Sequence, residues 1–188
     1  MKKPIVRSLS VTTVNVPLKR PIVASLGTFE KWPYMLIEIS CSDGTIGKGY
    51  IGPYLVHYTP AITLTMKELF KNFLNREIAP YQFFNEGMNH LSLLGRSGIA
   101  LYALAGLDIA FWDASSKISN EPLCVHLGGS LGNVKAYNSS GLWMDDPKIL
   151  YDETLDLISE GNFDAVKLRL GRSKLDEDLK AIENVKKG

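Results

Sequence analysis

Cysteine is scarce in this 188-residue chain, which contains only Cys41 and Cys124. Two cysteines are too few for the disulfide framework of a small secreted protein, so we expect reduced, buried thiols in a cytoplasmic protein. No apolar segment follows the basic start at residues 1–4, which argues against a signal peptide. The longest mostly apolar run, residues 99–112, is interrupted by Asp108 and is too short to cross a bilayer.

An excess of charge of one sign is missing as well. The chain has 21 Lys and Arg against 20 Asp and Glu, a formal net charge of +1. No global basic field is therefore available to hold nucleic acid or an anionic membrane, and we expect neither as a partner. Hydrophobic residues make up 45% and charged residues 22% of the chain, which is typical of a soluble globular protein with a sizeable core.

The front of the chain predicts a small antiparallel sheet, because β-branched and polar residues alternate there and a turn signal lies at residues 42–45. Three strands are expected over residues 5–18, 34–40 and 46–51. Residues 19–32 contain Pro and Gly and are expected to form a loop. Apolar residues at helical spacing then predict a helical bundle. Its helices are expected over residues 59–75, 81–94, 97–117 and 122–127.

The pattern changes after residue 132 to alternating strand and helix, which implies parallel strands joined by right-handed crossovers. Strands are expected over residues 134–140 and 163–170, and helices over 147–160 and 174–187. We place a domain boundary near residues 128–132, with an α+β domain over residues 1–130 and the start of a βα domain over 131–188. Two βα units leave edges and apolar faces uncovered, so we expect further strands or a partner chain to cover them.

The predicted strand within Ala165–Gly171 carries two cations on one face. Side chains alternate across a strand, so Lys167 and Arg169 point the same way. Their Cα atoms would lie about 6.6 Å apart along the strand. Two like charges this close favour the neutral form of a lysine, which is one way to make a general base. The alternative is that both residues form the solvent face of an edge strand.

Several segments together resemble the mandelate racemase and muconate lactonizing enzyme family of the enolase superfamily, closest to its mandelate racemase branch. These segments are Val14–Leu18, Leu36–Ile39, Tyr50, Tyr54, Ala105–Asp113, Pro122–Gly129, Ala136–Ser139 and Ala165–Gly171. The resemblance covers essentially the whole chain. It implies a capping domain with a three-stranded antiparallel sheet and a helical bundle, followed by the first two βα units of an incomplete (β/α)₈ barrel. It also implies Mg²⁺-dependent removal of the proton α to the carboxylate of a small acid, giving an enediolate.

The resemblance assigns roles to individual residues. Lys167 and Arg169 occupy the two positions of the family's Lys-x-Lys motif, where the catalytic groups are expected. The residues matching substrate-binding positions are Ser139, Tyr54, Ile22, Leu26 and Phe29. The family's Mg²⁺ ligands belong to later barrel strands, so we expect no metal ligands in this chain and an inactive N-terminal fragment. Homo-oligomers are common in the family and are expected here.

One position departs from the family motif, because Arg169 stands where the racemase base is a lysine. An arginine is essentially always protonated at pH 7, so proton transfer on both faces of a substrate is disfavoured. We therefore favour an acid-sugar dehydratase over a racemase, epimerase or cycloisomerase. Lys167 would then act as base or carboxylate ligand, with Arg169 as a fixed cation. Two non-catalytic alternatives remain: a domain that self-associates through its open barrel edge, and a small binding protein that uses Tyr54 and residues 21–32, which resemble the family's flap over the substrate.

Other polar residues have structural interpretations. Asp108 and Asp113 lie inside a predicted helix, where packing or capping is the expected role. His57, His90 and His126 show no pairing at metal-ligand spacing and are expected to be structural or surface residues. The Ser, Cys and His residues form no recognisable nucleophilic set along the chain.

Overall fold

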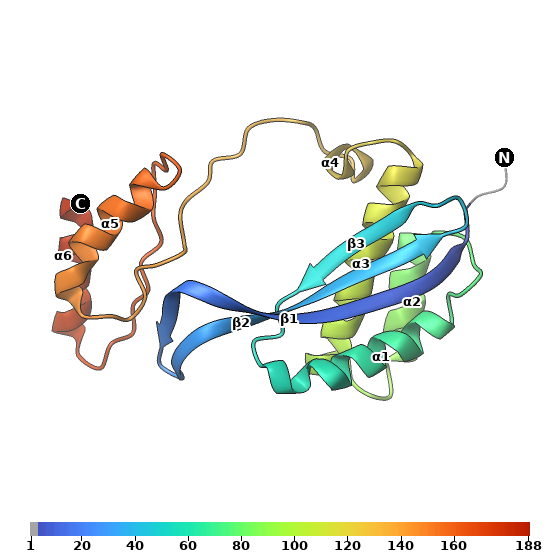
Figure 1. Cartoon of the computed structure of the whole chain (residues 1–188), viewed down its shortest axis with the longest axis horizontal. Helices are drawn as coiled ribbons and strands as arrows, with labels where there is room; N and C mark the ends of the chain where they lie inside the picture. The colour runs from blue at the N-terminus through green and yellow to red at the C-terminus, as the bar shows by residue number, and fades with distance from the viewer. Residues whose placement is uncertain (1–3) are drawn as a thin grey trace. The chain divides into compact units, whose positions relative to one another are not determined.

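The computed structural model describes residues 4–188 and divides the chain into two compact units (Figure 1). Unit 1 contains the chain up to Val16 together with Trp32–Leu131, and unit 2 contains Pro17–Lys31 together with Gly132–Gly188. The tip of the first hairpin therefore belongs to the unit formed by the end of the chain. The basic start at residues 1–3 lies outside the described residues.

The sheet is three-stranded, in the order β1 (Val6–Ala24), β2 (Gly27–Cys41) and β3 (Ile46–Ile51). Strands β2 and β3 pair antiparallel, from Met35 opposite Ile51 to Ser40 opposite Ile46. The predicted three-stranded antiparallel sheet is thus confirmed. The loop predicted over residues 19–32 is wrong, because β1 and β2 continue through it as two arms joined by a turn at residues 25–26. Pairing between the arms outweighs weak local strand propensity there, and an edge strand tolerates its prolines.

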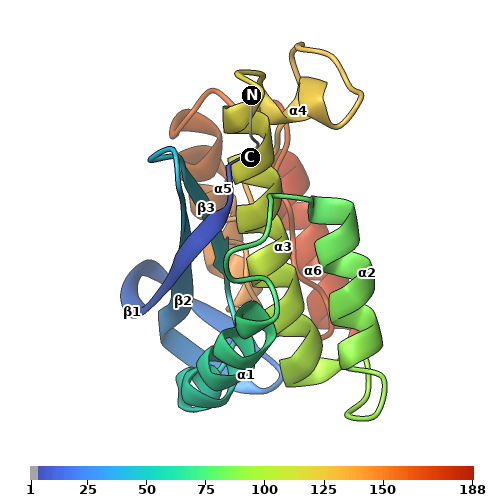
Figure 2. The same ribbon diagram turned by 90° about the vertical axis from the view of Figure 1, so that its right-hand side faces the viewer.

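Helices cover one face of the sheet in unit 1 (Figures 1 and 2). They are α1 (Thr59–Lys71), α2 (Pro80–His90) and α3 (Gly98–Ile118). A 3₁₀ turn at Val56–Tyr58 precedes α1, and the short α4 (Leu123–His126) follows α3. A proline occupies the first turn of α1 and of α2, where its missing N–H leaves no intrahelical bond unmade. All four predicted helices are present, and α1 and α2 end four residues earlier than predicted.

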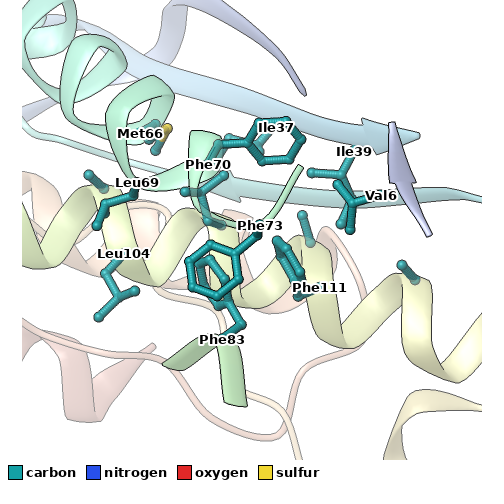
Figure 3. Close-up of a cluster of buried hydrophobic side chains, with 14 of the residues drawn as sticks. Val6, Ile37, Ile39, Met66, Leu69, Phe70, Phe73, Phe83, Leu104 and Phe111 are labelled. Carbon is teal, nitrogen blue, oxygen red and sulfur yellow. The ribbon is translucent and has the colours of Figure 1, made fainter. Parts of the chain in front are cut away.

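The core of unit 1 lies between the sheet and α1, α2 and α3 (Figure 3). Its labelled members in Figure 3 are Val6, Ile37, Ile39, Met66, Leu69, Phe70, Phe73, Phe83, Leu104 and Phe111. The rings of Phe83 and Phe111 stack with centroids 4.1 Å apart, and Phe73 packs edge-on against both. This aromatic cluster joins α2 to α3 and to the turn that follows α1.

Strand β3 approaches α3 unusually closely because two of its residues are glycines. A Cβ on Gly47 would overlap the carbonyl oxygen of Ala110, and one on Gly49 would lie 2.9 Å from the carbonyl oxygen of Gly106. Small residues on both elements thus let the two backbones touch. Packing of β3 against α3 depends on the absence of side chains at these positions.

The free edge of β3 is closed by side chains of α3. The Asp113 carboxylate accepts a 2.7 Å hydrogen bond from the Lys48 backbone N–H, and the Lys117 ammonium donates a 2.9 Å bond to the Ile46 carbonyl. Lys117 also pairs with Asp113 at 2.6 Å. Edge groups that are already bonded cannot recruit another strand, so Asp113 has the structural role predicted for it.

Unit 2 has its own small core. A 3₁₀ turn at Pro147–Ile149 precedes α5 (Leu150–Ser159), and α6 (Leu175–Lys187) ends the described chain. The buried hydrophobic residues of this core are Leu142, Leu150, Leu157 and Ala181, with Val166, Leu168 and Val185 partly buried against them. Both helices were predicted, but α5 begins three residues later and ends one residue earlier than predicted, and α6 begins one residue later.

The two parallel strands predicted for unit 2 are not formed as strands in the described residues. A single parallel bridge joins Asn138 to Val166. It rests on bonds from the Asn138 N–H to the Ala165 carbonyl and from the Lys167 N–H to the Asn138 carbonyl, each 3.0 Å long. A parallel pair is stable when both faces and both edges are covered, and one pair of helices does not cover them.

The cysteines differ from expectation. Cys41 is buried, and burial raises the pKa of its thiol to about 11. Cys124 is exposed on α4, so the prediction of a buried thiol is wrong there: none of the four residues of α4 is buried. Among residues 4–188, no helix has the length and apolar character needed to cross a membrane.

Candidate functional site

Lys167 and Arg169 lie on one face of their extended segment, as the alternation predicted. Val166 directly precedes Lys167, and Leu168 directly precedes Arg169. Both apolar residues pack on the core of unit 2. The Lys167 N–H donates to the Asn138 carbonyl, and the Arg169 N–H donates to the Leu142 carbonyl at 2.9 Å. The backbone therefore holds both cations beside the segment that runs from Asn138 to Leu142. Both residues are partly buried.

Trp143 fixes the position of Arg169. The guanidinium carbon of Arg169 lies 5.4 Å from the centroid of the Trp143 ring, within cation–π range. The indole Nε1 is buried and has no hydrogen-bond partner among residues 4–188. Sequence reasoning missed Trp143. The signal was an aromatic residue three positions after the first predicted parallel strand, where binding groups of βα folds gather.

Arg172 locks the two segments that carry these groups. Its side chain is only 6% exposed and pairs with Asp178 at 3.1 Å. It also donates to the carbonyl oxygens of Trp143, Asp145 and Arg169 at 3.1, 2.9 and 3.3 Å. One buried guanidinium thus joins the loop after residue 142 to the end of the Lys167 segment and to α6. The hydrogen bonds that Asp178 accepts lower its pKa below its ordinary value.

The β1 arm of the hairpin is tied to the rest of unit 2 through Glu160. Lys19 and Arg20 donate to the same carboxylate oxygen at 2.7 and 2.9 Å. The Asn138 amide donates to the other oxygen at 3.1 Å. These hydrogen bonds, first that from Arg20, lower the pKa of Glu160 to about 2. Glu160 therefore stays ionised and holds the arm at neutral pH.

A cavity of about 570 Å³ lies between this arm and the segment after Asn138. Lys19, Arg20 and Ile22 line it from the arm, and Ser140 and Trp143 line it from the other side. The cations in its wall are already paired with Glu160, so its free polar groups are few. The orphaned indole N–H belongs to one of its lining residues.

The predicted substrate-binding residues do not share one environment. Ile22 is partly buried in the cavity wall, while Leu26 is 89% exposed at the hairpin turn and Phe29 is partly buried on the returning arm. Ser139 is exposed, and it is the neighbouring Ser140 that lines the cavity. Tyr54 belongs to unit 1, where it packs edge-on against Trp32 with ring centroids 5.3 Å apart.

A metal site is not present in the described part of the chain. No three His, Cys, Asp or Glu side chains among residues 4–188 are grouped so that they could hold a metal ion. The described residues therefore do not fit a magnesium site by themselves, and we assign no chemical step to a metal.

The fold and the paired cations point to a family, and sequence comparison identifies it. The model for "Mandelate racemase / muconate lactonizing enzyme, N-terminal domain" matches residues 6–128. The match spans more than half of the chain, so the chain belongs to this family. The match ends close to Leu131, the last residue of unit 1.

Individual relatives agree with this assignment. Arabinonate dehydratase from Saccharolobus solfataricus is 29% identical over 153 residues, which is 79% of this chain and 40% of that protein. The structure of an enolase from alpha proteobacterium BAL199 with bound magnesium is 33% identical, with a TM-score of 0.93 over 97% of this chain and 51% of that one. An enolase from Bradyrhizobium in complex with magnesium and mandelic acid is 25% identical, with a TM-score of 0.87 over 100% of this chain and 51% of that one.

The matching proteins cover several reactions. Curated relatives include acid-sugar dehydratases, cycloisomerases, an epimerase and a racemase. The chain spans about half the length of the solved structures that it resembles, and half or less of these relatives.

Proposed function

We propose that this chain forms the capping domain and the first part of the barrel of an acid-sugar dehydratase. Such an enzyme removes the proton α to a carboxylate and expels the β-hydroxyl. The observation that carries the proposal is Arg169, a permanently protonated group held over Trp143 where the family motif has a second lysine. Chemistry that needs one base and one fixed cation suits Lys167 and Arg169 better than proton transfer on both faces of the substrate. Dehydratases of sugar acids among the relatives support this choice.

The two cations take different roles in this proposal. Lys167 accepts the α-proton or binds the substrate carboxylate. Arg169 keeps its charge and stabilises the negative charge that develops on the carboxylate oxygens. Trp143 and Arg172 hold Arg169 in place, which lowers the cost of ordering it when substrate arrives. Ile22 supplies an apolar wall nearby.

Magnesium is the cofactor of the proposed whole enzyme. When bound, it would stabilise the negative charge of the deprotonated substrate. Within residues 4–188, no three His, Cys, Asp or Glu side chains are grouped so that they could hold it. We therefore propose that the 188-residue chain alone has no turnover. The test is incubation with a panel of aldonic and aldaric acids and Mg²⁺, followed by detection of 2-keto-3-deoxy products; clear product formation would overturn this part of the proposal.

Substrate recognition is testable separately from turnover. Titration calorimetry with galactarate and with the uncharged alditol galactitol measures how far binding depends on the carboxylate. We expect galactarate to bind more tightly than galactitol, and the double variant Lys167→Met/Arg169→Met to lose most of that preference. Lys67→Met, which removes an exposed cation of α1, is the matched control and should change nothing. Equal binding of acid and alditol by the unaltered chain would contradict the assignment.

Self-association is the second candidate, supported by the segment after residue 130. Leu131, Val134 and Tyr137 are all exposed, Val134 by 90%, and the segment pairs through a single bridge at Asn138. Exposed apolar residues on an unpaired extended segment favour pairing with a second copy. Light scattering across a concentration series tests this candidate, and a clean monomer throughout would count against it.

A further inference from the structure

Three polar side chains at the end of α3 form a hydrogen-bonded series that the sequence did not reveal. The Ser115 hydroxyl lies 2.9 Å from His126 Nε2, and His126 Nδ1 lies 3.1 Å from a Glu121 carboxylate oxygen. Ser115 is in the last turn of α3, His126 ends α4, and Glu121 lies between the two helices. Trp112 packs edge-on against the imidazole with ring centroids 6.0 Å apart, which limits its rotation.

This order of groups is the one that activates a serine. With its proton on Nδ1, His126 donates to Glu121 and presents Nε2 as an acceptor to the Ser115 O–H. The carboxylate holds that tautomer and stabilises the imidazolium that forms when the serine loses its proton. The same hydrogen bonds could serve only to join α3 to α4, and Ser115 would then be unreactive. The reactivity of Ser115 therefore distinguishes a structural role from a catalytic one.

Ser115 also lines a cavity, which a purely structural contact does not require. The cavity measures about 170 Å³ and is bounded by Pro4, Ile78, Ile118 and Ser119 in addition to Ser115. Since a water molecule in the liquid occupies about 30 Å³, the space is large enough for a short acyl group. Its walls combine apolar side chains with polar groups, and the Ser119 hydroxyl is the other polar side-chain group among its lining residues.

We propose that Ser115 is a nucleophile that accepts a short acyl group from an activated ester. The Ser115 oxygen attacks the ester carbonyl carbon while its proton passes to His126 Nε2. The bond from that carbon to the alcohol oxygen then breaks, and the alcohol leaves with the proton from His126. Water hydrolyses the serine ester in the same way, which releases a carboxylic acid and restores Ser115. Glu121 acts as a positioning residue for His126, and none of the residues assigned to sugar-acid chemistry takes part.

The experiment is acylation of the 188-residue chain by p-nitrophenyl acetate, with nitrophenolate release followed by absorbance and the acetylated residue located by peptide mass spectrometry. We expect acetylation at Ser115, at a rate that rises with pH, because only a neutral imidazole can accept the Ser115 proton. Ser115→Ala should abolish labelling at that position. His126→Gln should slow acylation at least about tenfold and flatten the pH profile. Glu121→Gln changes only a half-exposed carboxylate and should shift the same profile.

Ser92→Ala, which alters an exposed serine elsewhere in unit 1, is the matched control and should leave Ser115 labelling unchanged. Circular dichroism confirms that each variant is folded, and a fluorophosphonate probe on the unaltered chain gives a second readout that requires no substitution. The proposal is overturned if Ser115 reacts no faster than Ser92 in the unaltered chain, or if His126→Gln leaves its rate and pH profile unchanged.

Discussion

Two aspartates of α3, five residues apart, have opposite surroundings. Asp113 accepts bonds from Lys48 and Lys117 at the sheet edge. Asp108 has an oxygen, Oδ1, that is buried and has no partner within residues 4–188. Burial raises the pKa of Asp108 to about 6. An uncompensated buried carboxylate opposes folding when it is charged, so this residue should lower the stability of the chain at neutral pH.

Asp108→Asn is therefore expected to stabilise the chain at pH 8. The pKa of Asp108 is higher in the folded chain, about 6, than its ordinary value of 3.8. The favourable contribution of Asp108 to the free energy of unfolding is thus fully present below about pH 4, and it is lost as the pH rises through 6. After allowance for solvent screening, the variant should gain about 1–2 kcal/mol at pH 8 and nothing at pH 3.5. Urea unfolding at the two pH values measures the difference.

The matched control for this prediction is Asp113→Asn on the same helix. It should destabilise the chain at pH 8 by about 1 kcal/mol, since the charge that pairs with Lys117 is lost. Loss of stability in Asp108→Asn at pH 8 would show that its carboxylate has a partner in solution.

At this scale, alternation was enough to place Lys167 and Arg169 on one face, because a strand fixes the direction of every second side chain. It was not enough to find Trp143, or the contact of Ser115 with His126. The Ser115 contact depends on how the chain turns between α3 and α4. Eleven residues separate the two side chains, and no periodic pattern joins them.

Among the elements, β3 was predicted with its observed bounds, because a turn signal and alternation both mark it. The hairpin arms over residues 19–32 were not predicted as strands. They are strands because they pair with each other, and local sequence alone does not show that pairing. The prediction of two strands in unit 2 was wrong for the opposite reason. Their local propensity is high, but parallel pairing needs neighbours that the described residues do not supply.

Gly47→Ala tests the close packing of β3 on α3. The added methyl group would overlap the Ala110 carbonyl, so β3 must move away from the helix and break its contacts. We expect a loss of about 3 kcal/mol or more, or no folded unit 1, measured by thermal and urea unfolding. Gly132→Ala is the control, because no atom lies within 4 Å of the position that its added Cβ would take, and it should cost little. A small effect at Gly47 would contradict the packing described.

Glu160→Gln tests the attachment of the hairpin arm. The amide cannot pair with Lys19 and Arg20 as the carboxylate does, so the arm should open more often. Amide hydrogen exchange at pH 7 should become faster in residues 17–31. Glu86→Gln, which breaks a comparable ion pair with Arg76 in unit 1, should leave the exchange of these residues unchanged.

The same attachment should weaken in acid. The pKa of Glu160 is lowered from 4.5 to about 2, so its stabilising contribution is present above about pH 4.5 and is lost as the pH falls through 2. Trp143 lines the same cavity as the arm and reports the change by its fluorescence. A fluorescence change between pH 4.5 and 2 that persists unaltered in Glu160→Gln would contradict this origin.

For the molecule as a whole, the order of the predicted elements and the family motifs sufficed for the α+β class. In the structure, residues 17–31 belong with the end of the chain and not with their neighbours in sequence. The two units also differ in their cores. Unit 1 buries a large aromatic and aliphatic cluster, whereas the hydrophobic core of unit 2 has four buried residues. Burial of apolar surface dominates stability, so unit 2 should be the less stable of the two.

Leu157→Ala and Leu104→Ala test this inequality, because each removes a fully buried leucine from one core. A buried leucine truncated to alanine costs about 2–5 kcal/mol. Leu157→Ala should abolish slow amide exchange in residues 138–188 while residues 35–118 keep theirs. Leu104→Ala should lower the protection of unit 1 in rising urea. Hydrogen exchange with mass spectrometry resolves the two units. Equal loss of protection in both units from either variant would show that the chain unfolds as one cooperative body.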